Sequence, residues 1–187
     1  MAITMTDIRG MLEAEGLKYL IDPNRPLCFF AVTGLSGTFQ VVIALELEGQ
    51  LLQLRTIRYA VCSAEQPAFP ALARALVELN GQHRFVKYSW DPSDGEVVVY
   101  GDHWIMDGTV TREQFRRMLG NFLPVIDQSF RRISQIIGTG TDPGNTNLVA
   151  VLRSLESKGG LDAALKDLLD KLSGGEEAGP AAPEITV

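Results

Sequence analysis

The sequence predicts an α+β protein: a five-stranded antiparallel sheet flanked by helices, in the order α-β-β-β-α-β-β-α, followed by a C-terminal helical extension. Apolar and polar residues alternate over residues 38–48, which is the period-two pattern of a half-buried strand. Apolar residues recur at helical spacing over residues 111–137, where Thr111 and Gln114 form a capping box at the start. The turns between successive strands are short, which favours antiparallel neighbours.

The first half of the chain contains one predicted helix and three predicted strands. Residues 4–15 form the helix, because their apolar positions recur at helical spacing and Thr4 or Thr6 can cap the first turn. In the third strand the alternation changes phase, and a bulge near Arg55 and Thr56 would account for the change. The three strands are predicted at residues 27–33, 38–47 and 51–61.

The second half contains two further helices and a hairpin between them. Ser63 and Gln66 fit a capping box that starts the second helix, and Asn80 with Gly81 ends it. The hairpin turns at residues 91–95, where proline and glycine favour a tight turn. Its two strands are predicted at residues 85–90 and 96–100.

A change in composition near residue 138 sets the predicted domain boundaries. Residues 1–138 form the core domain, and residues 139–147, which are rich in glycine, threonine and asparagine, form a flexible linker. Residues 148–173 are predicted to form a short helical extension. Residues 174–187 are rich in glycine, glutamate and proline, which predicts a disordered tail.

Composition argues against several classes of function. The net charge is −6 and the isoelectric point is about 4.9, whereas nucleic acids and anionic membranes require clustered lysine and arginine. No apolar stretch approaches the roughly 18 residues of a membrane span, and the first residues do not resemble a signal peptide. Cys28 and Cys62 are interpreted as buried thiols rather than as a disulfide. We therefore expect a cytoplasmic protein with no nucleic-acid or membrane partner.

No motif in the sequence amounts to a catalytic signature. The densest polar cluster is Asp102, His103 and Asp107, around Trp104, where a histidine with two carboxylates could bind a metal or act as a general base. We expect an ordinary loop there, since only His83 could add a second imidazole. The sequence therefore predicts a non-enzymatic protein without metal or cofactor. A small-molecule or metal-binding sensor or enzyme, with a pocket at Asp102, His103 and Trp104, is the alternative.

Four features together resemble the YbjN-type domain. They are the order of elements, the Leu72-Leu76-Leu79-Asn80 end of the second helix, the Trp90-Asp91…Gly95 hairpin and the long final helix. The resemblance covers about residues 4–137, and YbjN-type domains are similar in fold to the chaperones of bacterial type III secretion, which bind unfolded segments of effectors. It implies a twisted antiparallel sheet, frequent dimerisation and no established catalytic residues.

These observations support the hypothesis of a homodimeric module that binds a protein or peptide, in a chaperone-like or regulatory role. A sheet with helices on one side leaves its other face uncovered, and that face includes Val42 and Ala44. The third helix is locally basic and could bind an acidic peptide through Arg112 and Arg116, followed by Arg117, Arg131 and Arg132. A helix of about 12 residues is marginal in water, so the leucine stripe of the extension also needs a surface to cover it. That stripe includes Leu161, Leu165 and Leu168.

Overall fold

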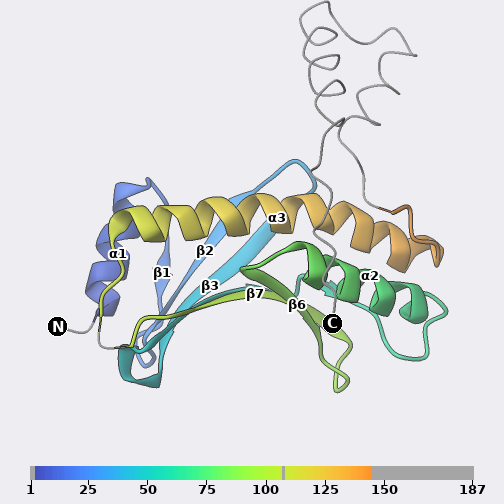
Figure 1. Ribbon diagram of the computed structural model, residues 1–187, viewed down its shortest axis with the longest axis horizontal. Coiled ribbons are helices and arrows are strands. Elements are labelled where there is room, and N and C mark those ends of the chain that lie inside the picture. The colour runs from blue at the N-terminus through green and yellow to red at the C-terminus, as the bar shows by residue number, and fades with distance from the viewer. Residues whose placement is uncertain (1–2, 107, 145–187) are drawn as a thin grey trace, which may run out of the picture. The chain divides into compact units, whose positions relative to one another are not determined.

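The computed structural model describes residues 3–106 and 108–144, which contain three helices and seven strands (Figure 1). The order helix, strands, helix, strands, helix confirms the predicted α+β class. The helices are α1 (Met5–Ala14), α2 (Phe69–Gln82) and α3 (Arg112–Thr139), with a short 3-10 turn η1 (Leu47–Gly49). The strands are β1 (Leu20–Ile21), β2 (Leu27–Thr33), β3 (Thr38–Glu46), β4 (Leu51–Ile57), β5 (Ala60–Val61), β6 (Val86–Trp90) and β7 (Glu96–Trp104).

The strands form one antiparallel sheet in the order β1-β2-β3-β4-β7-β5, and β6 also pairs with β7. The sheet of the described residues has seven strands, two more than the sequence predicted. The sequence pattern did not predict β1, and β5 is the separated end of the predicted third strand. The register of β3 with β4 is unbroken, from Gln40 opposite Ile57 to Glu46 opposite Leu51.

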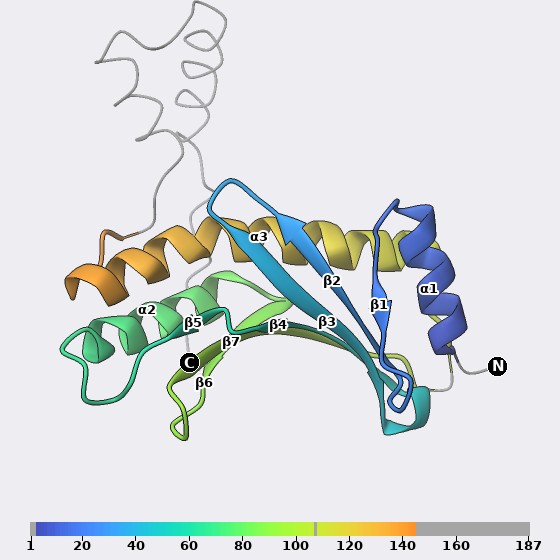
Figure 2. The same cartoon turned by 180° about the vertical axis from the view of Figure 1, so that it is seen from behind.

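The three helices pack on one face of the sheet and share a single hydrophobic core with it. Alternate residues of β3 and β4 belong to the same buried cluster as one face of each helix; among them are Val41, Ile43, Leu52, Leu54, Ile8, Leu72 and Phe122. The opposite face carries a separate cluster that includes Phe29, Val42 and Ile57, to which none of the described helices contributes. We call this the open face; β2 and β3 lie in front of α3 when the molecule is seen from behind (Figure 2).

The pairing of the predicted third strand with β7 is interrupted directly after Arg55, and it resumes at Ala60. Arg58 has a positive φ of 49°, and the four residues after Arg55 lie opposite two residues of β7. The Thr56 hydroxyl fills the gap, because it accepts a hydrogen bond from the Val99 N–H at 3.0 Å and donates to the Val99 carbonyl at 3.4 Å. The bulge therefore begins at the predicted position and extends to Tyr59.

Helix α2 starts later than its sequence predicts. Ser63 and Gln66 form no helical cap; the helix begins at Phe69, and its own cap residue makes no side-chain hydrogen bond. Two prolines explain the difference. Gln66 precedes Pro67, and the residue before a proline avoids the helical region, whereas Pro70 is tolerated only in a first turn. The helix therefore begins just before Pro70.

The caps predicted for the other two helices are confirmed. The Thr111 Oγ1 accepts from the Gln114 N–H at 3.2 Å, and the Gln114 Oε1 accepts from the Thr111 N–H at 2.8 Å. Thr4 and Asp7 form the equivalent box in α1, and the hydrogen bonds from Thr4 lower the pKa of Asp7. Helix α3 then runs without interruption to Thr139 and lies along the whole length of the sheet (Figure 1).

The predicted domain boundary at residue 138 falls in the last turn of α3, and the described chain continues to Gly144. Most of the predicted linker, the helical extension at residues 148–173 and the tail at residues 174–187 lie outside the described residues. No helix in the described part of the chain has the length and apolar character needed to cross a membrane.

Candidate functional site

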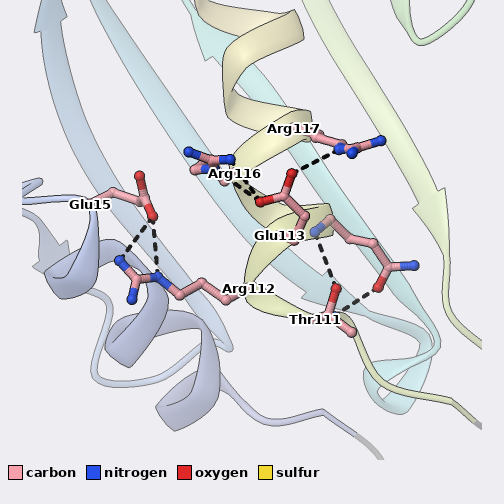
Figure 3. Close-up of polar contacts among 7 residues, drawn as sticks. Glu15, Thr111, Arg112, Glu113, Arg116 and Arg117 are labelled. Atoms are coloured by element: carbon pink, nitrogen blue, oxygen red, sulfur yellow. Dashed lines mark hydrogen bonds and ion pairs between the residues drawn. The ribbon is translucent and has the colours of Figure 1, made fainter.

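The arginines predicted to form a basic face are paired with carboxylates (Figure 3). Arg112 at the start of α3 lies 3.4 Å from Glu15 and donates to the Ala14 carbonyl at 2.9 Å, which ties α3 to the end of α1. Arg116 bonds Glu113 at 2.8 Å. Arg117 bonds the same carboxylate at 2.9 Å, and these two arginines lower the pKa of Glu113. The positive charge of these arginines, which was predicted to attract an acidic peptide, is therefore largely balanced by Glu15 and Glu113.

Further along α3 the predicted basic face does not continue through Arg132. This side chain is only 4% exposed, and it bonds Glu78 of α2 at 2.6 Å and Asp142 at 2.7 Å. The hydrogen bonds that Arg132 donates to Asp142 and Glu78 raise the pKa of Arg132, and Arg132 lowers the pKa of Asp142 in return. Arg132 thus fixes the chain after α3 against α2, while its neighbour Arg131 is exposed.

The structure places Val42 and Ala44 on the open face, as the alternation predicted, but both are buried. Val42 is 1% exposed and Ala44 is 7% exposed, because neighbouring strand residues pack over them. The other members of this cluster are Leu27, Phe29 and Ile57. Val42 and Ala44 therefore pack beneath their neighbours on the open face, and other residues form its accessible surface.

The accessible apolar part of the open face is a groove beside β1. It has a volume of about 470 Å³ and is lined by Lys18, Tyr19, Leu20, Phe29, Phe30, Ala31, Gln40 and Ile57. Leu20 is 74% exposed and pairs with Phe29 in the register of β1 with β2. We call this the β1 groove. Large apolar side chains that remain this exposed beside a hollow are typical of an interaction site.

The edge of the sheet next to the β1 groove is only partly covered. Strand β1 pairs with β2 at Cys28 and Phe29 alone, so within the described residues the outer edge of β2 has no strand beside Ala31 and Thr33. An uncovered edge presents unpaired N–H and C=O groups to which an extended chain can bond. Sequence reasoning missed Leu20 and Ile21, because two apolar residues are too few to show any periodicity.

The three residues of the alternative pocket do not lie on one face of the sheet, because His103 points away from the face that carries Asp102 and Trp104. Strand β7 extends through Trp104, so Asp102, His103 and Trp104 lie in a strand and not in the predicted loop. Successive strand residues point to opposite faces. Asp102 and Trp104 therefore share the open face, whereas His103, opposite Leu52, has the parity of the core face. Asp102 accepts a hydrogen bond from Gln53 at 2.8 Å.

Two further predictions concern metal ligands and the leucine stripe. Among the residues that the structure describes, no group of three or more histidines, cysteines, aspartates or glutamates is placed to hold a metal ion. Leu161, Leu165 and Leu168 lie outside the described residues, so their place as a binding surface stays a prediction.

Comparison with models of known protein families shows the family to which this chain belongs. Residues 4–135 match the model of the family described as "YbjN: Putative bacterial sensory transduction regulator". The chain belongs to the YbjN family. The match covers nearly the whole described unit and confirms the resemblance that the element order indicated. None of the curated proteins matches the chain.

Several solved structures are similar to this YbjN-family chain. The crystal structure of YbjN from E. coli is 20% identical, with a TM-score of 0.49, over 72% of this chain and 89% of that one. A chain of the HopA1–SchA chaperone–effector complex is 9% identical, with a TM-score of 0.45, over 63% and 84%. A chain of the ExsC–ExsE complex is 19% identical, with a TM-score of 0.46, over 71% and 97%.

Proposed function

We propose that this YbjN-family protein is a non-enzymatic module that binds a protein or peptide, in a chaperone-like or regulatory role, as a homodimer in the cytoplasm. The observation that carries the proposal is the β1 groove beside the uncovered edge of β2. The description of the family as a sensory transduction regulator supports a regulatory role.

An extended peptide fits this arrangement because it can satisfy backbone and side-chain contacts together. Its main chain would pair with the free edge of β2, and alternate side chains would enter the groove. Main-chain pairing supplies affinity that is independent of sequence, and the groove selects apolar side chains at every second position. Leu20, Phe29 and Ile57 supply the apolar lining, and the exposed Lys18 also lines the groove.

The peptide proposal predicts a loss of binding when the groove becomes charged. The probe is a phage library of random peptides selected on the full chain, from which we expect sequences with alternating apolar residues. Replacing Leu20 with aspartate should weaken a selected peptide about tenfold or more, because burying a leucine contributes about 1.5–3 kcal/mol. Isothermal titration calorimetry measures the change.

The control for Leu20→Asp is Val61→Asp. Val61 is also an exposed apolar residue, at 55%, but it lies in β5 and does not line the groove. The control should bind the selected peptide as the wild type does. Equal weakening by both substitutions, or a selection that yields no binding peptide, would contradict the proposal.

The homodimer is tested separately. At tens of micromolar, light scattering should give a mass about twice the chain mass of 20.5 kDa. Exposed apolar side chains such as Val77 of α2, at 73%, supply surface for such a contact. A mass that stays at that of a single chain at these concentrations would exclude a stable dimer and leave the groove proposal standing.

A further inference from the structure

The turn η1 and the end of β7 meet at one end of the sheet (Figure 1). Three large apolar side chains in or next to these segments remain exposed. They are Leu47, Trp104 and Met106, which are 56%, 58% and 58% exposed. We call them the Trp104 patch. None of them lines the β1 groove, so the patch is a second surface.

Backbone contacts hold the parts of the patch next to each other. The Gln50 N–H donates to the Leu47 carbonyl at 3.1 Å, and the Gln50 carbonyl accepts from the Met106 N–H at 3.3 Å. Leu51, the next residue, pairs with Trp104 in the register of β4 with β7. Leu47, Trp104 and Met106 are thus held together, because each of them pairs with the backbone of Gln50 or Leu51.

The backbone at two of these positions is in a conformation that apolar residues avoid. Leu47 has a φ of 48° and Met106 has a φ of 54°, in the left-handed region that normally favours glycine or asparagine. Neither side chain gains burial in return. Non-glycine residues in this backbone region cluster at functional sites.

The surroundings of the patch are acidic. A hollow of about 610 Å³ beside η1 is lined by apolar and acidic side chains, including Ile3, Leu45, Leu47, Glu46 and Glu48. Glu46 lies opposite Leu51, which lies opposite Trp104, so these three residues form one row across the open face. Asp102 precedes Trp104 by two residues on that face.

No lysine or arginine occurs at residues 44–52 or 101–110 of the sequence. Within the described residues Glu46, Glu48 and Asp102 make no ion pair. The basic residue closest in sequence to the hollow is Arg25, and its guanidinium already bonds Asp22 at 2.8 Å. The patch therefore offers apolar contact beside the carboxylates of Glu46 and Glu48, which make no ion pair within the described residues.

We propose that the Trp104 patch binds a protein segment in which lysine or arginine flanks apolar side chains. The apolar side chains of that segment would cover Trp104, Leu47 and Met106, and its cations would lie beside Glu46 and Glu48. Tryptophan at such a position is typical of residues that dominate the energy of an interface. Complementary charge would select basic segments and reject acidic ones.

The experiment uses the full chain with Trp90→Phe, which leaves Trp104 as its single tryptophan. The probe is a synthetic peptide of leucine and lysine, about 18 residues long, in an amphipathic helical pattern. The comparison peptide has glutamate in place of lysine. We expect the lysine peptide to move Trp104 fluorescence to shorter wavelengths as the indole leaves water, and the glutamate peptide to leave it unchanged.

Two sets of variants separate contact at the patch from general attraction by an acidic protein. Glu46→Gln with Glu48→Gln should weaken the lysine peptide about tenfold at low salt, and Leu47→Asp should abolish the wavelength shift. Glu65→Gln with Asp94→Asn removes the same charge at exposed sites elsewhere and should change the affinity less than about threefold. Circular dichroism checks that each variant is folded.

Binding of the lysine peptide, followed by fluorescence anisotropy, without a shift of Trp104 would overturn the inference, as would equal weakening by the two charge variants. A Trp104 spectrum that moves to longer wavelengths when the protein alone is diluted would show that a second copy covers the patch, which also contradicts it. Leu20→Asp should leave the Trp104 shift unchanged. Failure at the β1 groove and failure at the Trp104 patch are therefore distinguishable.

Discussion

Replacing Phe122 with alanine should lower the free energy of unfolding by about 3–5 kcal/mol, the range found for buried phenylalanines. Phe122 lies in the middle of α3, is completely buried and belongs to the core that the helices share with the sheet. Its loss removes apolar contact and leaves a cavity, because a close-packed interior relaxes only in part. Urea unfolding followed by circular dichroism gives the change.

The control for Phe122→Ala is Leu35→Ala at the turn between β2 and β3. Leu35 is fully exposed at 101%, so its truncation should change stability by less than about 0.5 kcal/mol. A cost for Phe122→Ala below about 1 kcal/mol would mean that α3 is not packed on the sheet as described.

The sequence predicted the elements whose signals are local and long enough to repeat. Thr111 and Gln114 marked the start of α3 because a capping box needs only four neighbouring residues. The alternation over residues 38–48 predicted the β3 strand because it is also a local signal, but it did not predict that residues 41–45 are all buried. The capping-box prediction was wrong for α2. Ser63 and Gln66 fit the box, but Pro67 and Pro70 prevent a helix from forming at Ser63 and Gln66.

The candidate surfaces were harder to predict because exposure depends on residues that are distant in sequence. Val42 and Ala44 were assigned to the correct face, yet strand neighbours bury them. The pairing of Arg116 with Glu113 could be predicted from their helical spacing. The pairing of Arg112 with Glu15 could not, since it joins α3 to the end of α1.

A buried polar cluster between the sheet and α3 should also make a large contribution to the free energy of unfolding. Ser129, Tyr59 and Tyr88 are each at most 5% exposed. The Tyr88 hydroxyl donates to the Ser129 Oγ at 2.7 Å, and the Tyr59 hydroxyl donates to the Ile126 carbonyl at 2.6 Å. Ser129→Ala should cost about 1–3 kcal/mol, because it leaves a buried hydroxyl of Tyr88 without this partner.

A double-mutant cycle tests this explanation against simple loss of packing. Tyr88→Phe in the wild type should cost about 1 kcal/mol for the lost hydrogen bond. In the Ser129→Ala background the same change should be neutral or stabilising, since it removes the hydroxyl that lost its partner. Costs that add within about 0.5 kcal/mol would show that the two groups do not interact.

The pH dependence of stability gives an independent measurement of the same cluster. Burial raises the pKa of Tyr88 to about 12 from its ordinary value of 10.0, and burial also raises the pKa of Tyr59. A tyrosine whose folded pKa is raised contributes its full stabilisation below pH 10, and that contribution is lost as the pH rises from 10 towards 12. Tyr88→Phe should therefore reduce the fall in stability between pH 10 and 12. An unchanged fall would place the Tyr88 hydroxyl in water and contradict its burial against α3.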